Sequence, residues 1–227
     1  MAQPQQPETK SSDLGVRALS AAIMIPPAIV AIHFGTPYFE ALVIIGAAIL
    51  VYELHSASGG RLIWTVLGTG YIALAITGLL SLRLPIDHGA LTIYWLFILV
   101  WSADTLAYFV GRNVGGPKLA PKLSPKKTWS GFIGALAGAA IVGAALAIYL
   151  EKTTIWPLIV VSALLGAISQ FGDLLESWFK RRFHRKDMSG LIPGHGGLFD
   201  RVDGLLAATI ACWFYQVWSE GILLAWL

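Results

Sequence analysis

Long apolar runs separated by short polar segments divide the chain into stretches of membrane length. A helix that spans a bilayer needs about 20 mostly apolar residues. Seven stretches meet this requirement, at approximately residues 16–34, 37–54, 62–82, 89–111, 130–150, 154–177 and 203–226. The pattern therefore predicts an all-α, polytopic transmembrane helical bundle with about seven spans.

The composition supports a membrane protein. Of the 227 residues, 56% are hydrophobic and 13% are charged, whereas a soluble domain carries about 25% charged residues. The length allows a single membrane-embedded domain over residues 16–227, preceded by a polar arm, residues 1–15, that we expect to be disordered. The single cysteine, Cys212, excludes a disulfide framework and a cysteine metal cluster.

Lys and Arg residues lie almost entirely on one side of the predicted spans. If the N-terminus is cytoplasmic, the outer side holds only Arg83 and Lys152 of the sixteen Lys and Arg residues. Cytoplasmic loops of membrane proteins carry an excess of these residues. The bias therefore predicts a cytoplasmic N-terminus and places both long polar loops, 112–129 and 178–202, on the cytoplasmic face. A multi-pass protein of a bacterial inner (cytoplasmic) membrane fits this pattern.

The segment from Ser177 to Asp203 carries the strongest chemical signal in the chain. It places many basic residues, three Asp residues and a Gly-rich turn between two apolar stretches. Cationic side chains near clustered carboxylates suit a site that binds phosphate and a divalent cation. The segment indicates phosphate chemistry at a membrane surface, with the site mainly within residues 100–204.

Carboxylates at two neighbouring helix ends are candidate metal ligands. Asp173 shares a helix face with Ser177 and Lys180, at i+4 and i+7, and a carboxylate in or near the membrane is costly and usually functional. Asp200 and Asp203 open the last span, where favourable interaction with the helix dipole is the structural alternative. Because Mg²⁺ prefers carboxylate oxygens, the sequence predicts a clamp of Asp173 and Asp200 around one or two metal ions.

The turn at residues 193–197 allows the backbone to approach a ligand closely. Its glycines, which include Gly196 and Gly197, permit unusual dihedral angles, and successive N–H groups can form an anion-binding nest. His195 in the same turn is a candidate base or a candidate hydrogen-bond donor to phosphate. A flexible hairpin is the structural alternative.

Other polar residues leave functional and structural interpretations open. Residues 124–128, Ser-Pro-Lys-Lys-Thr, have the composition of a phosphate-binding turn. The general excess of Lys and Arg in cytoplasmic loops would also explain any single lysine there. Asp104 lies inside the fourth span, where a buried acid needs a partner. Glu176 is either a site residue or half of an ordinary i, i+4 ion pair with Lys180.

The segment as a whole resembles the signature of a known family, the phosphatidate cytidylyltransferases, also called CDP-diacylglycerol synthases. The residues that carry the resemblance at matching spacing are Ser177, Lys180, Arg181, Lys186, Asp187, His195, Gly196, Gly197, Asp200, Arg201, Val202 and Asp203. Gly172, Asp173 and the segment 124–129 are also similar to that family. The resemblance covers approximately residues 100–227, and Ser130 departs from the acid or amide expected in many relatives.

The resemblance implies a reaction and its cofactor. Members of the family transfer the cytidylyl group of CTP to phosphatidic acid, which gives CDP-diacylglycerol and pyrophosphate, and they use Mg²⁺. By resemblance, Asp173 and Asp200 would hold the metal centre, with a second cation as an option. The expected catalytic residues are Asp173, Asp200, Lys126, Lys180, Arg181 and His195. The expected substrate-binding residues are Ser124, Lys127, Thr128, Ser177, Lys186, Asp187, Gly196, Gly197, Arg201, Asp203 and Asp104.

Alternatives to this function stay open from the sequence. Another nucleotide-using lipid enzyme, such as a polyprenol kinase, would share basic loops and acidic helix ends. A transporter would use Asp104 and Asp173 as an ion path, but its charges would be spread across the bilayer depth. An inactive relative would keep the fold without turnover. The expected partners are CTP, phosphatidic acid and the lipid bilayer, not nucleic acid, and a homodimer is one option for the assembly.

Overall fold

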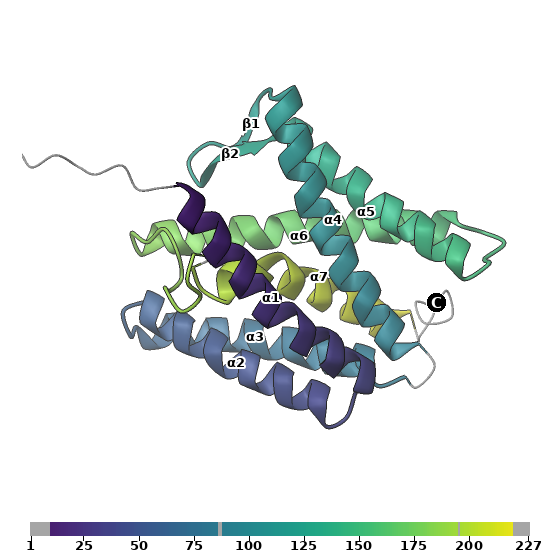
Figure 1. Ribbon diagram of the computed structural model, residues 1–227, viewed down its shortest axis with the longest axis horizontal. Helices are drawn as coiled ribbons and strands as arrows, with labels where there is room; N and C mark the ends of the chain where they lie inside the picture. The colour runs from purple at the N-terminus through teal and green to yellow at the C-terminus, as the bar shows by residue number, and fades with distance from the viewer. Residues whose placement is uncertain (1–9, 86–87, 195, 220–227) are drawn as a thin grey trace, which may run out of the picture.

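The computed structural model describes residues 10–85, 88–194 and 196–219, with side chains from residue 22 onward. Most of this part of the chain is helical, as the ribbon in Figure 1 shows. The helices are α1 (Lys10–Phe34), α2 (Tyr38–Ala57), α3 (Leu62–Arg83), α4 (Gly89–Val114), α5 (Trp129–Tyr149), α6 (Trp156–Arg182) and α7 (Phe199–Trp218).

The prediction of a helical membrane protein is confirmed in its main features. Among the described residues, five helices, α2 to α6, are long and apolar enough to cross a membrane, and they correspond to the second to sixth predicted spans. The apolar part of α1, Ala22–Phe34, is shorter. The last predicted span begins within α7 and continues into residues 220–226, which lie outside the described part. Seven spans and a cytoplasmic N-terminus therefore stay predictions.

Two local features differ from the sequence-based expectation. Helix α1 begins at Lys10, so residues 10–15 are helical and not part of a disordered arm. Hydroxyl and acidic residues are favourable near a helix start, and the Ser-Ser-Asp run at 11–13 supplies them. The other feature is a β-hairpin inside the predicted polar loop, where β1 (Lys118–Ala120) pairs antiparallel with β2 (Ser124–Thr128).

The hairpin leads directly into α5. Thr128 is the N-cap of α5, and its hydroxyl accepts a hydrogen bond from the backbone N–H of Gly131 at 3.1 Å. A capping hydroxyl satisfies one of the free N–H groups at a helix start. The cap orients the end of β2, so the position of Lys127 just before it is determined by both the hairpin and the helix.

Glycines allow α4, α5 and α6 to pack closely. A Cβ atom added at Gly138 would lie 2.6 Å from the carbonyl oxygen of Ser102 in α4, and one added at Gly143 would lie 2.4 Å from the carbonyl oxygen of Leu158 in α6. Small residues at such contacts are typical of membrane helices, which associate through close packing. The three helices therefore form a tight unit whose polar end carries the hairpin.

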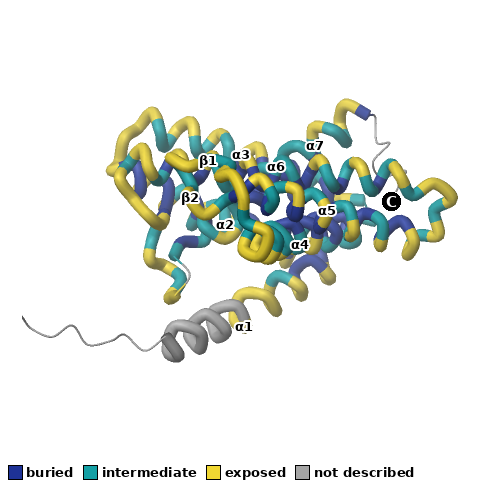
Figure 2. Tube along the Cα trace, turned by 90° about the horizontal axis from the view of Figure 1, so that it is seen from above, coloured by how far each residue is buried: buried dark blue, intermediate teal, exposed yellow. Residues whose placement is uncertain are grey.

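Helix α7 joins this unit to the N-terminal helices, because it packs on both α6 and α3. Figure 1 shows α7 between α6 and the pair α2 and α3. The tube in Figure 2 shows buried residues where the helices meet and exposed residues on their outer faces. Many of those exposed residues are large and apolar, for example Ile133, Ile141 and Leu164, as expected for surfaces that face lipid.

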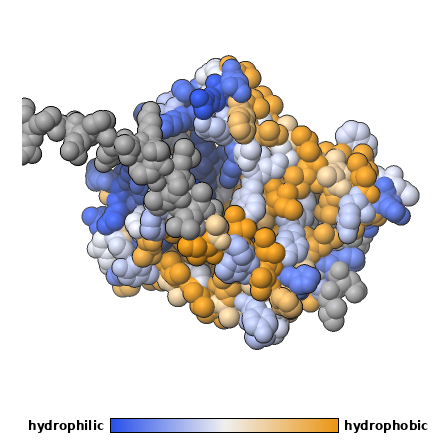
Figure 3. Space-filling model, viewed as in Figure 1, coloured by the Kyte–Doolittle hydropathy of each residue, from blue (hydrophilic) through white to orange (hydrophobic). Residues whose placement is uncertain are grey.

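Polar residues gather at one end of the molecule. In Figure 3, hydrophilic residues surround the hairpin, whereas hydrophobic residues cover much of the rest of the visible face. The C-terminal end of α6 and the loop at 183–198 lie at the same end as the hairpin. The predicted site residues on these segments are therefore close in space.

Candidate functional site

Three carboxylates from α6 and α7 form a cluster. Ligand oxygens of Asp173, Glu176 and Asp203 all lie within 4.8 Å of one another. Small residues beside them allow the two helices to approach, because a Cβ atom added at Gly172 would lie 2.7 Å from the carbonyl oxygen of Asp203. We refer to Asp173, Glu176 and Asp203 as the acidic cluster.

A polar chain connects the acidic cluster to the hairpin and to α4. The Nζ atom of Lys127 lies 2.7 Å from Oδ2 of Asp173 and donates to Oε1 of Gln170 at 3.0 Å. The amide nitrogen of Gln170 donates to Oδ1 of Asp104 at 2.8 Å. Asp104 thus reaches the site through Gln170, a residue that the sequence analysis did not select.

Lys180 joins the acidic cluster to a fourth carboxylate. Its Nζ atom lies 2.7 Å from Oε2 of Glu176 and 2.7 Å from Oδ1 of Asp200. The three side chains are only 12%, 3% and 4% exposed, respectively. Removal of one partner from a buried ion pair leaves an uncompensated charge, which is strongly destabilising.

The acidic cluster has the properties of a site for a hard divalent cation. The Oε1 atom of Glu176 is buried and has no hydrogen-bond partner among the described residues. Buried polar atoms in proteins are nearly always paired, and Glu176 offers an oxygen within 4.8 Å of carboxylate oxygens of Asp173 and Asp203. Mg²⁺ and similar cations bind through carboxylate oxygens, so the residues present fit such an ion.

Asp200 binds the protein's own backbone. Its Oδ2 atom accepts hydrogen bonds from the N–H groups of Met188 at 2.9 Å and Gly197 at 2.8 Å, while Oδ1 faces Lys180. Each oxygen of Asp200 therefore has a partner within the protein. The structure groups Asp173 with Glu176 and Asp203, not with Asp200 as the sequence analysis expected, because the loop before α7 folds back over the first turn of that helix.

The Gly-rich turn is also occupied by internal contacts. Gly196 has a φ of 84°, and its N–H donates to the carbonyl oxygen of Ile192 at 3.1 Å. Because the N–H of Gly197 donates to Asp200, these two N–H groups of the expected anion nest are directed at the protein itself. His195 lies outside the described residues.

A buried glutamate from α2 holds the same loop, and the sequence analysis missed it. Glu53 is fully buried. Its carboxylate accepts hydrogen bonds from the hydroxyl of Ser189 at 2.6 Å and from the N–H groups of Leu198 and Phe199, both at 2.8 Å. The last two are free donors at the start of α7. The available signal was a carboxylate inside an apolar stretch, which is expensive in a membrane and usually has a partner.

Gly197 allows this contact. A Cβ atom added there would lie 2.7 Å from Oε1 of Glu53. The glycine is thus required by close approach to a carboxylate of the protein, whereas the sequence analysis expected it to admit a ligand. Glu53 and Asp200 together hold the loop and the first turn of α7, and we call this pair the loop clamp.

The remaining predicted site residues fall into two groups. Ser177 donates to Oδ1 of Asp173 at 3.3 Å, and Arg181 donates to the carbonyl oxygen of Leu123 at 3.4 Å, which ties α6 to the hairpin. Ser124 is half-buried at the start of β2. The others lie on the surface near the polar end, namely Lys126, Lys186, Asp187 and Arg201.

Comparison with known proteins assigns the chain to a family. Residues 18–218 match the model of the cytidylyltransferase family. Because this match covers most of the chain, the protein belongs to the cytidylyltransferase family.

The chain is also similar to individual bacterial proteins named phosphatidate cytidylyltransferase. It is 45% identical to the protein of Brucella abortus (strain 2308) over 170 residues, which are 75% of this chain and 62% of the relative. It is 35% identical to the protein of Rickettsia bellii over 208 residues, 88% of this chain and 89% of that relative. The chain thus matches less than two thirds of the length of the Brucella protein, but most of the Rickettsia protein.

Proposed function

We propose that this protein transfers the cytidylyl group of CTP to phosphatidic acid, which produces CDP-diacylglycerol and pyrophosphate for phospholipid biosynthesis. The observation that carries the proposal is the acidic cluster, which lies beside Lys127 and Lys180 at the polar end of a bundle of membrane-length helices. The family assignment supports it, as does the similarity to bacterial proteins named phosphatidate cytidylyltransferase.

The acidic cluster would hold Mg²⁺. Asp173, Glu176 and Asp203 would each supply a carboxylate oxygen, and Oε1 of Glu176 has no hydrogen-bond partner among the described residues. The bound cation would neutralise phosphate charge. Asp200, the ligand expected from the sequence, would instead act through Lys180. A second cation remains part of the proposal.

The protein's own residues would mainly position two polyanions. The phosphate of phosphatidic acid is already an anionic nucleophile, so the reaction needs little activation of that group. The phosphate oxygen attacks the α-phosphorus of CTP, and the bond to the β-phosphate breaks in line with release of pyrophosphate. Lys127 and Lys180 would attract the phosphates, so catalysis rests on positioning and electrostatics. No covalent enzyme intermediate is required.

The surface residues of the polar end would support substrate capture. Lys126, Lys186 and Arg201 are exposed there and would attract CTP from solution, as charged surfaces do for oppositely charged ligands. The one-sided distribution of Lys and Arg supports a site on the cytoplasmic face of the inner membrane. There CTP arrives from the cytoplasm and the lipid arrives from the inner leaflet.

The decisive experiment is a transfer assay with purified protein. The protein in detergent is incubated with labelled CTP, phosphatidic acid and Mg²⁺, and a parallel sample contains EDTA. We expect label to move into the lipid phase and EDTA to prevent it. Well-folded protein that transfers no label to any of several phosphatidic acids would refute the proposed function.

A further inference from the structure

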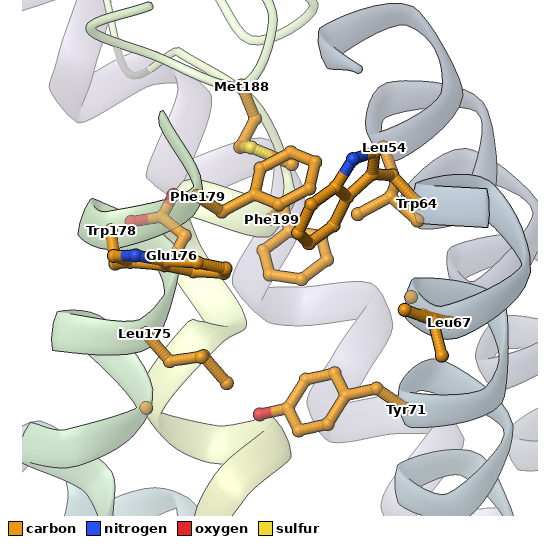
Figure 4. Close-up of a pocket in the computed structure, with 12 residues that line it drawn as sticks. Leu54, Trp64, Leu67, Tyr71, Leu175, Glu176, Trp178, Phe179, Met188 and Phe199 are labelled. Carbon is orange, nitrogen blue, oxygen red and sulfur yellow. The ribbon is translucent and has the colours of Figure 1, made fainter. Parts of the chain in front are cut away.

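An apolar cavity of about 190 Å³ lies beside the acidic cluster. Figure 4 shows its two facing walls, which come from α3 and α6, with Met188 of the following loop and Phe199 of α7 behind them. The lining residues are Leu54, Trp64, Leu67, Gly68, Tyr71, Gly172, Leu175, Glu176, Trp178, Phe179, Met188 and Phe199. All but Glu176 present mainly apolar or aromatic surface.

One side of the cavity is buried in the protein, and its rim is exposed. Met188 is fully buried and Leu54 is nearly so, and these residues lie deep in the cavity wall. Leu67 is 59% exposed and Leu175 is 49% exposed. These two residues belong to the membrane-length helices α3 and α6, and exposed apolar side chains on such helices are suited to contact with acyl chains.

The cavity is continuous with the proposed catalytic site. Glu176 both lines the cavity and belongs to the acidic cluster, and Gly172 in the wall directly precedes Asp173. Figure 4 shows the hydroxyl of Tyr71 directed from α3 across the cavity. When the phosphate of a lipid lies at the acidic cluster, the start of an acyl chain can therefore reach this apolar space.

The depth and size of the cavity favour one acyl chain. Its walls come from the beginning of α3 and the end of α6, the same end of the bundle that carries the hairpin, so they lie in the leaflet nearest the site. The volume is below the range of about 300–1,000 Å³ for pockets that enclose a whole drug-sized ligand. Such a space holds the first part of a chain, while the rest of the chain stays in the bilayer.

We propose that this cavity binds the glycerol-proximal part of one acyl chain of phosphatidic acid, so that the enzyme prefers chains long enough to fill it over very short chains. The inference rests on the proposed function, because that function supplies the lipid phosphate at the acidic cluster. Leu67 and Leu175 act as specificity-determining residues at the rim. Trp64 and Trp178 are also of the type found at membrane interfaces, so the tests separate a lipid site from simple interfacial anchoring.

The first test fills the cavity. Leu67→Trp places a larger side chain at the rim, and Leu74→Trp is the matched control, because Leu74 is two turns further along α3, is 42% exposed and does not line the cavity. For Leu67→Trp, kcat/KM with dioleoyl phosphatidic acid should fall on the order of tenfold relative to dibutanoyl phosphatidic acid, the loss expected from displacing about two buried methylene groups. The KM for CTP should not change.

Two results of this test would overturn the proposal. One is an equal loss for long and short lipids, and the other is the same loss of long-chain preference in Leu74→Trp.

A second test needs no variant. A phosphatidic acid with a photoreactive diazirine near the carbonyl end of one chain is crosslinked to the wild-type protein in micelles, and the labelled peptides are identified by mass spectrometry. We expect labelling near Leu67 and Leu175 that unlabelled phosphatidic acid competes and phosphatidylcholine does not. Labelling spread evenly to the outer face of α5, for example at Ile141, and insensitive to competition would overturn the proposal.

The two proposals fail in different ways. Competed labelling of the cavity without cytidylyl transfer would support the lipid site and refute the proposed function. Transfer without competed labelling would leave the function in place and refute the cavity as an acyl-chain site.

Discussion

The acidic cluster and the loop clamp are built from the same residue types, but their oxygens have different partners. In the loop clamp, Glu53 and Asp200 accept hydrogen bonds from backbone N–H groups, a hydroxyl and Lys180. In the acidic cluster, carboxylates face one another, and one oxygen of Glu176 has no partner among the described side chains. Carboxylates that accept from backbone N–H groups hold the backbone in place, whereas a buried oxygen without a partner is available to a ligand.

The two regions depend on each other through α7. The loop clamp determines where α7 begins, and Asp203 of the acidic cluster lies in the first turns of that helix. Lys180 contacts both regions, since it bridges Glu176 and Asp200. A substitution in the acidic cluster should therefore remove a group that takes part in the reaction. A substitution in the loop clamp should leave these groups present but shift their positions.

The largest effect is expected for Asp173→Asn and for Asp203→Asn. Each replaces a carboxylate of the acidic cluster by a neutral amide, which weakens cation binding, and cytidylyl transfer should fall by about a hundredfold to a thousandfold. Glu151→Gln, at the opposite end of the bundle, is the control and should keep its activity. Gel filtration should show folded protein in each case, and near-normal transfer by both Asp variants would contradict the role of the cluster.

Lys127→Met should cause the next largest decrease in cytidylyl transfer. Lys127 is the cation between Asp173 and Gln170, and its loss removes a positive charge from the phosphate site and leaves two acceptors unpaired. We expect a decrease in transfer of about ten- to a hundredfold, with a raised KM for at least one substrate. Lys152→Met is a control on the predicted outer side, and equal activities of the two variants would exclude Lys127 from the site.

Glu53→Gln tests the loop clamp. Glu53 accepts from the N–H groups of Leu198 and Phe199 with different oxygens, but Gln has only one acceptor oxygen. One buried N–H group therefore loses its partner, at a cost of about 1–3 kcal/mol. The melting temperature in detergent should fall, and kcat should decrease more than either KM because the reacting groups are misplaced. Glu151→Gln, an exposed site at the opposite end of the bundle, should change neither. A loss of stability with unchanged kcat would show that Glu53 is structural alone.

The smallest effect is expected for Gly197→Ala. The added methyl group would lie 2.7 Å from Glu53, and overpacking of this kind costs about 1–3 kcal/mol. The penalty should be much smaller in a Glu53→Ala background, because the clash is then absent, so a double-mutant cycle should be non-additive. Additive changes in melting temperature would show that the glycine is needed for another reason.

Local patterns in the sequence predicted a substantial part of the site. Helices α2 to α6 follow from apolar length, which the membrane requires of a spanning helix. The contacts of Asp173 with Ser177 and of Glu176 with Lys180 are i, i+4 pairs on a single helix face, so helical periodicity was sufficient to place them.

Contacts between distant segments were not accessible in this way. Glu53 and Phe199 are separated by 146 positions, and no local pattern connects them. Gln170 was overlooked for a similar reason, because its importance depends on Lys127 of the hairpin and Asp104 of α4. The hairpin itself is short, and its strands are visible only once Lys118 lies opposite Thr128.

The sequence by itself determined that the chain is a helical membrane protein with charge at one end. It also selected Asp173, Asp203 and the lysines of the proposed site, but it left the role of Glu176 open. The tertiary structure decided which carboxylates face one another and which bind the loop before α7. The physical reason is that periodicity specifies the faces of a single helix, whereas the close approach of separate segments depends on packing. Here Gly172 allows α6 to approach α7, and Gly197 allows the loop before α7 to approach Glu53. Asp200 and Asp203 lie three residues apart on α7, yet packing directs one to the loop and the other to the acidic cluster.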